Sequence, residues 1–193
     1  MMAAPVGAPD EPTSDPRSDL DLIAAINDGD TGAFEVVYHR HRDWVVNLAF
    51  RFTGDRDLAL DVLQETFLYF VKKFPGFRLT ANFKTFLYPA VKNLSIAARR
   101  KAGRVQSTIE EQAAIENATA TGPEPRDDEP LNVGLRALSE EHRQVLLLRF
   151  VDELSLAEIG ESLEIPLGTV KSRLHYALDL LRRDPRTRNL FDP

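Results

Sequence analysis

The sequence predicts an all-α protein with two small helical domains joined by a flexible acidic linker. No segment alternates apolar and polar residues with a period of two, and no Asn-Gly or Asp-Gly pair lies between β-branched runs. Apolar residues recur instead at spacings of three and four, in two blocks separated by a stretch rich in Ala, Thr, Gly, Pro and acidic residues. We therefore expect a disordered tail at 1–18, helical domains at 19–103 and 131–183, the linker at 104–130 and a second tail at 184–193.

The composition suits a folded protein of the cytoplasm. Hydrophobic residues make up 43% of the chain, which is enough for a core. The absence of cysteine excludes disulfides and thiolate metal sites, and no apolar run approaches the roughly 20 residues of a membrane-spanning helix. The first 18 residues lack the basic start and apolar core of a signal peptide, and no regulatory domain is expected after Asp184. We expect a cytoplasmic protein without membrane insertion.

Charge is unevenly distributed along the chain, although the formal net charge is only −6. No acidic residue lies between Glu65 and Glu110, whereas nine basic residues do. Residues 105–135 contain seven acidic residues against Arg126 alone. A second basic cluster lies near the C-terminus, at Lys171, Arg173, Arg182, Arg183, Arg186 and Arg188. This segregation predicts two basic surfaces on an acidic tether, which the net charge alone conceals.

The first domain contains three long stretches with helical periodicity. The first covers 34–52, and the second is expected to begin after an N-cap at Asp55. A loop around Pro75-Gly76 separates it from the third helix, at 83–101. Pro89 lies inside that helix, where it removes a backbone donor and costs about 3 kcal/mol unless the helix is kinked.

Residues 154–183 carry the sharpest motif, a helix-turn-helix. Ser155 and Glu158 form a capping box at the start of a short helix, and Glu164-Ile165-Pro166 supplies the turn. The second helix is expected to direct six side chains outward near its N-terminus: Thr169, Lys171, Ser172, Arg173, His175 and Tyr176. Such a helix enters the major groove of DNA, where it contacts phosphates and base edges. An ordinary helical hairpin with a solvated basic face is the alternative.

The run from Leu138 to Phe150, followed by this motif with its Gly-Thr-Val-Lys-Ser-Arg-Leu segment at 168–174, resembles domain four of extracytoplasmic-function (ECF) sigma factors of bacterial RNA polymerase. The resemblance implies that these six residues contact the upstream (minus-thirty-five) promoter element as duplex DNA. Response-regulator output domains share part of the pattern. No alternating βα receiver pattern lies upstream of it here.

The run Asp61-Val62-Leu63-Gln64-Glu65-Thr66-Phe67 resembles the polymerase-docking motif of sigma domain two. Four residues lie away from the apolar stripe of their helix: Asp61, Gln64, Glu65 and Leu68. An exposed leucine beside two carboxylates and an amide suits a basic partner helix. The resemblance implies that this partner is the clamp of the largest subunit of core RNA polymerase. Without the resemblance, a solvated helix face is the simpler interpretation.

The acid-free basic stretch suits single-stranded DNA, because basic residues interleaved with an aromatic can hold phosphates and stack on bases. The candidates are Phe77, Arg78 and Asn82 in the loop, and Lys84, Tyr88, Lys92, Asn93, Arg99 and Arg100 on the following helix. The resemblance implies that this region melts and holds the downstream (minus-ten) promoter element and captures a flipped base. Core packing is the alternative for Phe77 and for Phe83.

Three positions depart from the family pattern. Phe86 stands where the family usually has Trp, Ala97 where an acidic residue is common, and Tyr176 where Arg is frequent. The contacts made through these positions in the family do not carry over directly. We therefore expect a promoter preference that differs from the family norm.

The sequence thus predicts a sigma factor that binds core RNA polymerase and directs promoter-specific initiation, with an anti-sigma factor as a further partner implied by the resemblance. The alternative is a polymerase-independent helix-turn-helix regulator or a sigma mimic that titrates an anti-sigma factor, and a helical scaffold is a third interpretation. No nucleophile elbow, phosphate loop or metal-ligand spacing is present, so we expect no enzymatic activity, cofactor or metal. His41 lies on an apolar stripe and is expected to be a hydrogen-bonded core histidine.

Overall fold

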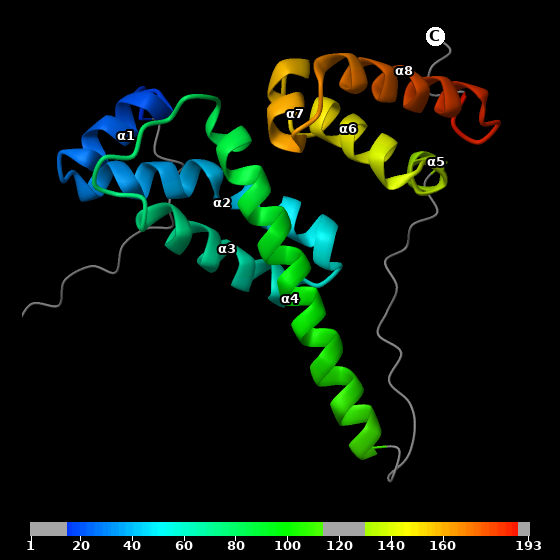
Figure 1. The fold of residues 1–193 in the computed structure, drawn as a ribbon, viewed down its shortest axis with the longest axis horizontal. Helices are drawn as coiled ribbons and strands as arrows, with labels where there is room; N and C mark the ends of the chain where they lie inside the picture. Colours follow the sequence, from blue (N-terminus) through cyan, green and yellow to red (C-terminus); the bar gives the residue numbers. More distant parts are fainter. Residues whose placement is uncertain (1–14, 114–129, 189–193) are drawn as a thin grey trace, which may run out of the picture. The chain divides into compact units, whose positions relative to one another are not determined.

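The structure is a computed structural model that describes residues 15–113 and 130–188, and within these ranges it contains eight α-helices and no β-strand. The predicted all-α fold is confirmed. The chain divides into two compact units between Arg99 and Arg100, and each unit is described by itself (Figure 1). Nowhere in the described ranges does a helix combine the length and the apolar character that crossing a bilayer requires.

The first unit starts with three helices that pack in sequence order, α1 (Asp19–Asn27), α2 (Thr31–Thr53) and α3 (Arg56–Val71). Each begins at a side-chain cap that accepts backbone N–H bonds: Ser18 for α1, Asp30 for α2 and Asp55 for α3. The predicted cap at Asp55 is therefore confirmed. Helix α2 ends at Gly54, whose φ of 71° lies in the left-handed region that favours glycine.

The core of the first unit is rich in aromatic rings. Phe70 of α3 is fully buried, and its ring centroid lies 4.9 Å from that of Phe83 and 6.1 Å from that of Phe34. His41 is 6% exposed, and its Nε2 lies 2.9 Å from Oδ2 of Asp19. The expectation of a hydrogen-bonded core histidine is confirmed.

Helix α4 (Phe83–Ala113) is longer than predicted and appears as one continuous helix in Figure 1. It contains Pro89, as expected, and passes through Gly103 without ending there. The prediction that the flexible linker begins at 104 is wrong, because residues 104–113 continue the helix. One glycine in a helix costs only about 1 kcal/mol relative to alanine, which a long helix tolerates. The remainder of the predicted linker, 114–129, lies outside the described residues, as does the tail at 1–14.

The second unit contains α5 (Pro130–Ala137), α6 (Glu140–Phe150), α7 (Leu156–Leu163) and α8 (Leu167–Arg183). Helix α8 packs against both α6 and α7. The buried residues Leu138, Leu146, Ala177 and Leu181 form a core cluster between α5, α6 and α8. Apolar faces of α5, α6 and α8 therefore meet in one small core.

The chain after α8 folds back onto α5, which differs from the predicted tail at 184–193. Thr187 is fully buried, and its hydroxyl donates a hydrogen bond to the carbonyl of Leu181. A Cβ at Gly134 of α5 would overlap the methyl group of Thr187, so glycine is needed for this close approach. Asp184 accepts hydrogen bonds from Arg186, and these bonds lower the pKa of Asp184 to about 2. Residues 189–193 lie outside the described part.

Candidate partner and nucleic-acid interfaces

Helix α3 presents the four predicted docking residues on one exposed face. Asp61, Gln64, Glu65 and Leu68 recur at spacings of three and four, and all four are exposed. Leu68 is 51% exposed, although the residues between these four, such as Phe67, are buried in the core. Further large apolar side chains of the helix are also exposed, namely Leu60, Tyr69 and Val71. The face combines uncovered apolar surface with two carboxylates.

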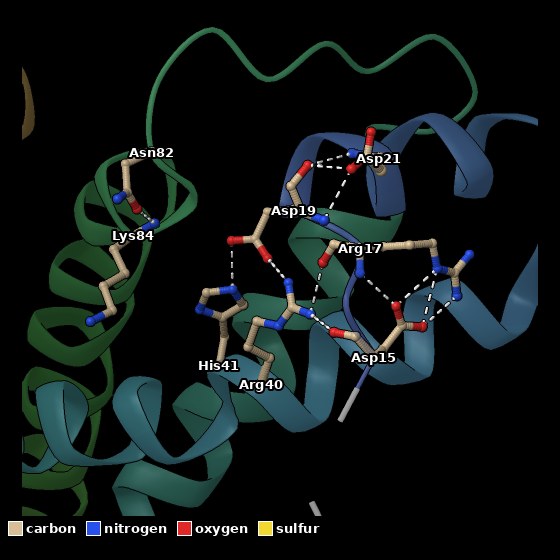
Figure 2. Close-up of polar contacts among 9 residues, drawn as sticks. Asp15, Arg17, Asp19, Asp21, Arg40, His41, Asn82 and Lys84 are labelled. Atoms are coloured by element: carbon tan, nitrogen blue, oxygen red, sulfur yellow. Dashed lines mark hydrogen bonds and ion pairs between the residues drawn. The ribbon is translucent and has the colours of Figure 1, made fainter. Parts of the chain in front are cut away.

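The loop between α3 and α4 gives different surroundings to the three predicted pocket residues. The ring of Phe77 is half-buried and packs 4.7 Å from Phe86 and 5.7 Å from Phe70, so it anchors the loop to the core. Oδ1 of Asn82 accepts a 2.9 Å hydrogen bond from the backbone N–H of Lys84 at the start of α4 (Figure 2). Arg78 is exposed and has no hydrogen-bond or ion-pair partner among the described residues. Of the three, Arg78 and Asn82 are exposed, and Arg78 is the one whose polar atoms make no contact within the described part of the chain.

Asn27, at the end of α1, holds this loop and was missed by the sequence analysis. Its Oδ1 accepts a 2.7 Å hydrogen bond from the N–H of Gly76, and its Nδ2 donates a 2.8 Å bond to the carbonyl of Phe77. Nearly fifty residues separate these partners in the sequence. No local pattern could have paired them.

Helix α4 does not present all of its predicted contacts to solvent. Tyr88 is only 1% exposed and packs on Phe52 of α2, with ring centroids 6.3 Å apart. The prediction that Tyr88 lines the basic surface is therefore wrong, because α4 buries this position against α2. Other predicted residues of the helix are exposed, namely Asn93, Arg99 and Arg100, or half-buried, namely Lys84 and Lys92.

Two of these basic side chains already have neighbours within the first unit. A guanidinium N–H of Arg99 donates a 3.2 Å hydrogen bond to the carbonyl of Phe52. The ammonium of Lys84 lies 5.9 Å from the ring centroid of Trp44 on α2, within the range of a cation–π contact. These contacts hold both side chains near the surface of α4. Trp44 was not predicted to contribute to this surface.

A polar network fixes the segment before α1 onto α2 (Figure 2). Arg40 of α2 bonds the Asp19 carboxylate at 2.6 Å and the carbonyls of Asp15 and Arg17 at 3.1 and 3.0 Å. Burial raises the pKa of Asp19, but the hydrogen bonds and charges of His41 and Arg40 outweigh it and hold that pKa below its usual value. The side-chain hydrogen bond from Arg17 lowers the pKa of Asp15 to about 2. The network holds the segment before α1 on α2, and its His41 ring packs 4.7 Å from that of Phe83, the residue between the predicted DNA contacts Asn82 and Lys84 (Figure 2).

The helix-turn-helix has the predicted form in α7 and α8. The amide of Glu158 donates to Oγ of Ser155 at 3.2 Å, and the amide of Ser155 donates to the Glu158 carboxylate at 2.7 Å, so the capping box is confirmed. Helix α7 ends at Glu164 in the left-handed conformation, with a φ of 55°. Pro166 directly precedes the first residue of α8, as expected.

The first half of α8 presents the six predicted contacts with unequal exposure. Lys171, Ser172, His175 and Tyr176 are exposed, whereas Thr169 and Arg173 are half-buried. Helix α6 provides neighbours that the sequence analysis missed. Arg173 forms a 2.7 Å ion pair with Glu141, and the ring of Tyr176 lies 4.9 Å from that of His142. A basic, polar surface is thus held firmly on a rigid helix pair.

The described residues contain no group of three or more His, Asp or Glu side chains placed to hold a metal ion. The exposed face of α3 joins apolar and acidic groups. The surface of the loop and α4 and the surface of α8 carry cations beside hydroxyl, amide and aromatic groups.

Comparisons with known proteins agree with this division. A model of Sigma-70 region 2 matches residues 37–105, and a model of Sigma-70, region 4 matches residues 134–183. The chain is 32% identical over 177 residues to the ECF RNA polymerase sigma factor SigW of Bacillus subtilis, covering 85% of this chain and 95% of the relative. It is 28% identical over 184 residues to the ECF RNA polymerase sigma-E factor of Escherichia coli K12, covering 87% and 94% respectively.

Solved structures share the fold. The structure of CnrH in complex with the cytosolic domain of CnrY matches with a TM-score of 0.61 at 20% identity, over 90% of this chain and 97% of that one. The sigma factor RpoE of Bartonella quintana, solved with the anti-sigma factor NepR, matches with a TM-score of 0.52 at 22% identity, over 73% and 89%. Both Sigma-70 regions and a relative aligned over nearly its whole length point to one conclusion: the chain belongs to the extracytoplasmic-function family of RNA polymerase sigma factors.

Proposed function

We propose that this chain binds core RNA polymerase and directs it to promoters through two separate DNA contacts. The first unit docks on the polymerase and holds the melted minus-ten element, and the second binds the upstream element as duplex. The observation that carries the proposal is that the two Sigma-70 regions match different compact units, each with its own exposed interaction surface. The polymerase supplies the chemistry, so the chain itself is not an enzyme and acts where the polymerase is, in the cytoplasm.

The α3 face is the proposed polymerase contact. Asp61 and Glu65 offer two carboxylates, and the exposed Leu68 on the same face offers apolar area that water leaves on binding. This combination suits a basic helix with apolar residues, such as the clamp coiled coil of the largest polymerase subunit. The buried side of α3 keeps the face rigid.

The loop and α4 form the proposed contact with the melted strand. Arg78 is exposed, and Asn93 and Arg100 lie exposed on α4 with Lys92 half-buried beside them. Cations along one surface attract the phosphates of single-stranded DNA, and the strength of this attraction falls with salt. Tyr88 has no part in this contact because it is in the core. Any base stacking must therefore use another residue of the surface.

The first half of α8 is the proposed contact with duplex DNA. Lys171 is free to reach a phosphate or a guanine, whereas Arg173 must exchange its ion pair with Glu141 for a DNA contact. The Ser172 hydroxyl donates to the carbonyl of Thr169 at 3.0 Å, which leaves its oxygen as an acceptor. The exposed ring of Tyr176 takes the place of the arginine frequent in the family.

An anti-sigma factor is the proposed regulatory partner. Large apolar side chains are exposed in both units, on α3 at Leu68 and Val71 and at the end of α6 at Phe150 and Val151. Contiguous exposed apolar area of this kind is typical of protein–protein contacts. A partner that covers the α3 face would prevent polymerase binding directly.

Reconstitution with core RNA polymerase on a promoter library tests the proposal. We expect initiation at a restricted set of promoters that depends on this chain and is lost in the double variant Lys171→Ala/Arg173→Ala. The matched control Arg182→Ala/Arg183→Ala removes the same charge from the far end of α8 and should retain initiation. Tight, specific duplex binding without polymerase, and no initiation with it, would instead favour a polymerase-independent regulator.

A further inference from the structure

The backbone of the loop between α3 and α4 is held by one side chain that lies outside the loop, Asn27 of α1. Oδ1 of Asn27 accepts the N–H of Gly76 at 2.7 Å, and Nδ2 donates to the carbonyl of Phe77 at 2.8 Å. The second hydrogen of Nδ2 goes to the carbonyl of Ile23, one turn earlier in α1, at 3.1 Å. This last bond fixes the orientation of the amide, so its acceptor faces Gly76 and its donor faces Phe77.

The anchored turn has a conformation that few residues adopt. Gly76 has a φ of 93°, in the region that favours glycine. The rings of Phe74 and Phe77 on either side of it pack 5.6 Å apart and each contacts Phe70. The aromatic contacts fix the two side chains, while Asn27 fixes the backbone between them. The turn is thus held from two independent directions.

Arg78 is the first residue after this anchored turn. It is exposed and has no polar partner among the described residues, so only the preceding backbone determines where its guanidinium can reach. Side chains that recognise a ligand are effective when their support holds them in place before binding. A loop freed from Asn27 would leave Arg78 to search a larger volume.

We propose that Asn27 is a positioning residue for the capture of unpaired promoter DNA, holding Gly76 and Phe77 so that Arg78 is aligned with the melted strand. This inference rests on the proposed function of the loop. Asn27 itself does not need to touch DNA. Its effect on promoter melting is exerted through the backbone of the turn.

The geometry distinguishes two substitutions. Asn27→Ala removes the bonds and leaves the N–H of Gly76 and the carbonyl of Phe77 to water. Asn27→Asp keeps an acceptor for Gly76 but directs a second carboxylate oxygen at the carbonyls of Phe77 and Ile23, where two acceptors repel each other. We therefore expect Asn27→Asp to disturb the loop more than Asn27→Ala does. Asn47→Asp, at an exposed position of α2, is the matched control for the same change of charge.

The test measures promoter opening by the reconstituted holoenzyme, with 2-aminopurine placed in the minus-ten region. At the usual net contribution of a hydrogen bond, loss of the two loop bonds should slow opening by roughly thirtyfold in Asn27→Ala. Asn27→Asp should slow it further, and Asn47→Asp should open at the wild-type rate. The affinity for core polymerase and for duplex promoter should stay unchanged in all three. Base preference in the minus-ten region should weaken in the two Asn27 variants, which a general loss of stability would not produce.

Arg78→Ala distinguishes failure of the inference about Asn27 from failure of the proposed function of the loop. If Arg78→Ala opens promoters slowly and Asn27→Ala opens them at the wild-type rate, the inference about Asn27 is overturned and the proposed function of the loop stands. If both variants open promoters at the wild-type rate, the proposed function of the loop fails too. Should an Asn27 variant fold poorly, amide hydrogen exchange in the unaltered protein decides: protection of the Gly76 amide supports the anchor, and free exchange overturns it.

Discussion

Gly160 sets how closely α7 approaches the turn that follows it. It is buried, and its carbonyl accepts a 2.9 Å hydrogen bond from the N–H of Ile165. A Cβ at this position would lie 3.0 Å from the carbonyl oxygen of Ile165, which is closer than a carbon and an oxygen normally approach. The angle between the two helices of the DNA-binding motif therefore depends on Gly160 having no side chain.

We expect Gly160→Ala to lower the free energy of unfolding by about 1–3 kcal/mol, because the turn must shift to admit the methyl group. Gly168→Ala is the matched control in the same motif, since a Cβ there meets nothing within 4 Å. It should not lower stability, and it should raise the free energy of unfolding by up to about 1 kcal/mol because alanine favours the helix more than glycine does. Urea unfolding of the full chain measures both, and equal stability of the two variants would contradict the proposed close approach.

Asp19 links the start of α1 to two residues of α2, Arg40 and His41, and its side chain is 22% exposed. The pKa of Asp19 is lowered in the folded protein, whereas in the unfolded chain it is about 3.9. Below that value the unfolded state binds more protons, so the stability that this carboxylate contributes is present above about pH 4 and is lost as the pH falls further.

We expect Asp19→Asn to cost about 1.5–3 kcal/mol of stability at pH 7, the range for a hydrogen bond to a charged group. As the pH falls below about 4, the difference between the variant and the wild type should shrink. Asp43→Asn is the control, because that carboxylate is 84% exposed. Thermal unfolding between pH 7 and pH 2.5 measures the trend, and a difference independent of pH would show that Asp19 acts only through packing.

At the scale of the elements, α4 illustrates what periodicity captures and what it misses. The apolar periodicity predicted the helix, and Phe83 and Leu87 lie on its buried face. It did not predict that α4 packs on two helices at once, with Phe83 against Phe70 of α3 and Tyr88 against Phe52 of α2. A helix with two neighbours buries a wider arc than a single stripe, so Tyr88 lies inside.

Helix α3 allows the docking face to be tested without loss of the fold, because its exposed and buried residues are cleanly separated. We expect Glu65→Lys to weaken binding to core polymerase at least roughly tenfold, since it places a cation opposite a basic partner. Glu35→Lys makes the same change at a site on α2 that is 74% exposed, and binding should persist. Equilibrium binding to core polymerase measures both variants. Equal binding would locate the polymerase contact elsewhere.

Helix α6 influences the DNA-binding helix through Glu141, which pairs with Arg173 at 2.7 Å and is itself 64% exposed. Exposed pairs contribute at most about 1 kcal/mol, so this one can open when a phosphate approaches. We expect Glu141→Gln to strengthen binding of the holoenzyme to the upstream element by up to roughly fivefold at low salt. Glu140→Gln, at the neighbouring position that pairs with Arg143, should have a smaller effect. Weaker binding by Glu141→Gln would mean that the pair positions Arg173 and does not compete for it.

At the scale of the whole molecule, features set by local sequence were predictable and features set by distant contacts were not. The capping box at Ser155 and the cap at Asp55 depend on neighbours within three residues, and both were predicted. Asn27 bonds residues nearly fifty positions away, and the Glu141 and Arg173 pair spans two helices, so neither leaves a local signal. The burial of Thr187 likewise depends on α5, so the sequence after α8 alone predicts only a tail.

The two units have separate proposed roles. The first binds polymerase and the melted minus-ten element, and the second binds the upstream element as duplex. Each unit has a complete small core and an exposed basic surface of its own. The first unit also carries the apolar and acidic face of α3. A change in the DNA contacts of one unit should therefore leave the other unit's contacts intact.

Sequencing of transcripts initiated from a randomised promoter library, with core polymerase and this chain, tests the central claim most directly. We expect the wild type to select bases in two separate promoter regions. Arg78→Ala should weaken selection only in the downstream region, and Lys171→Ala only in the upstream region. Initiation that does not depend on the chain, or the same altered region in both variants, would contradict the account of two independent DNA contacts.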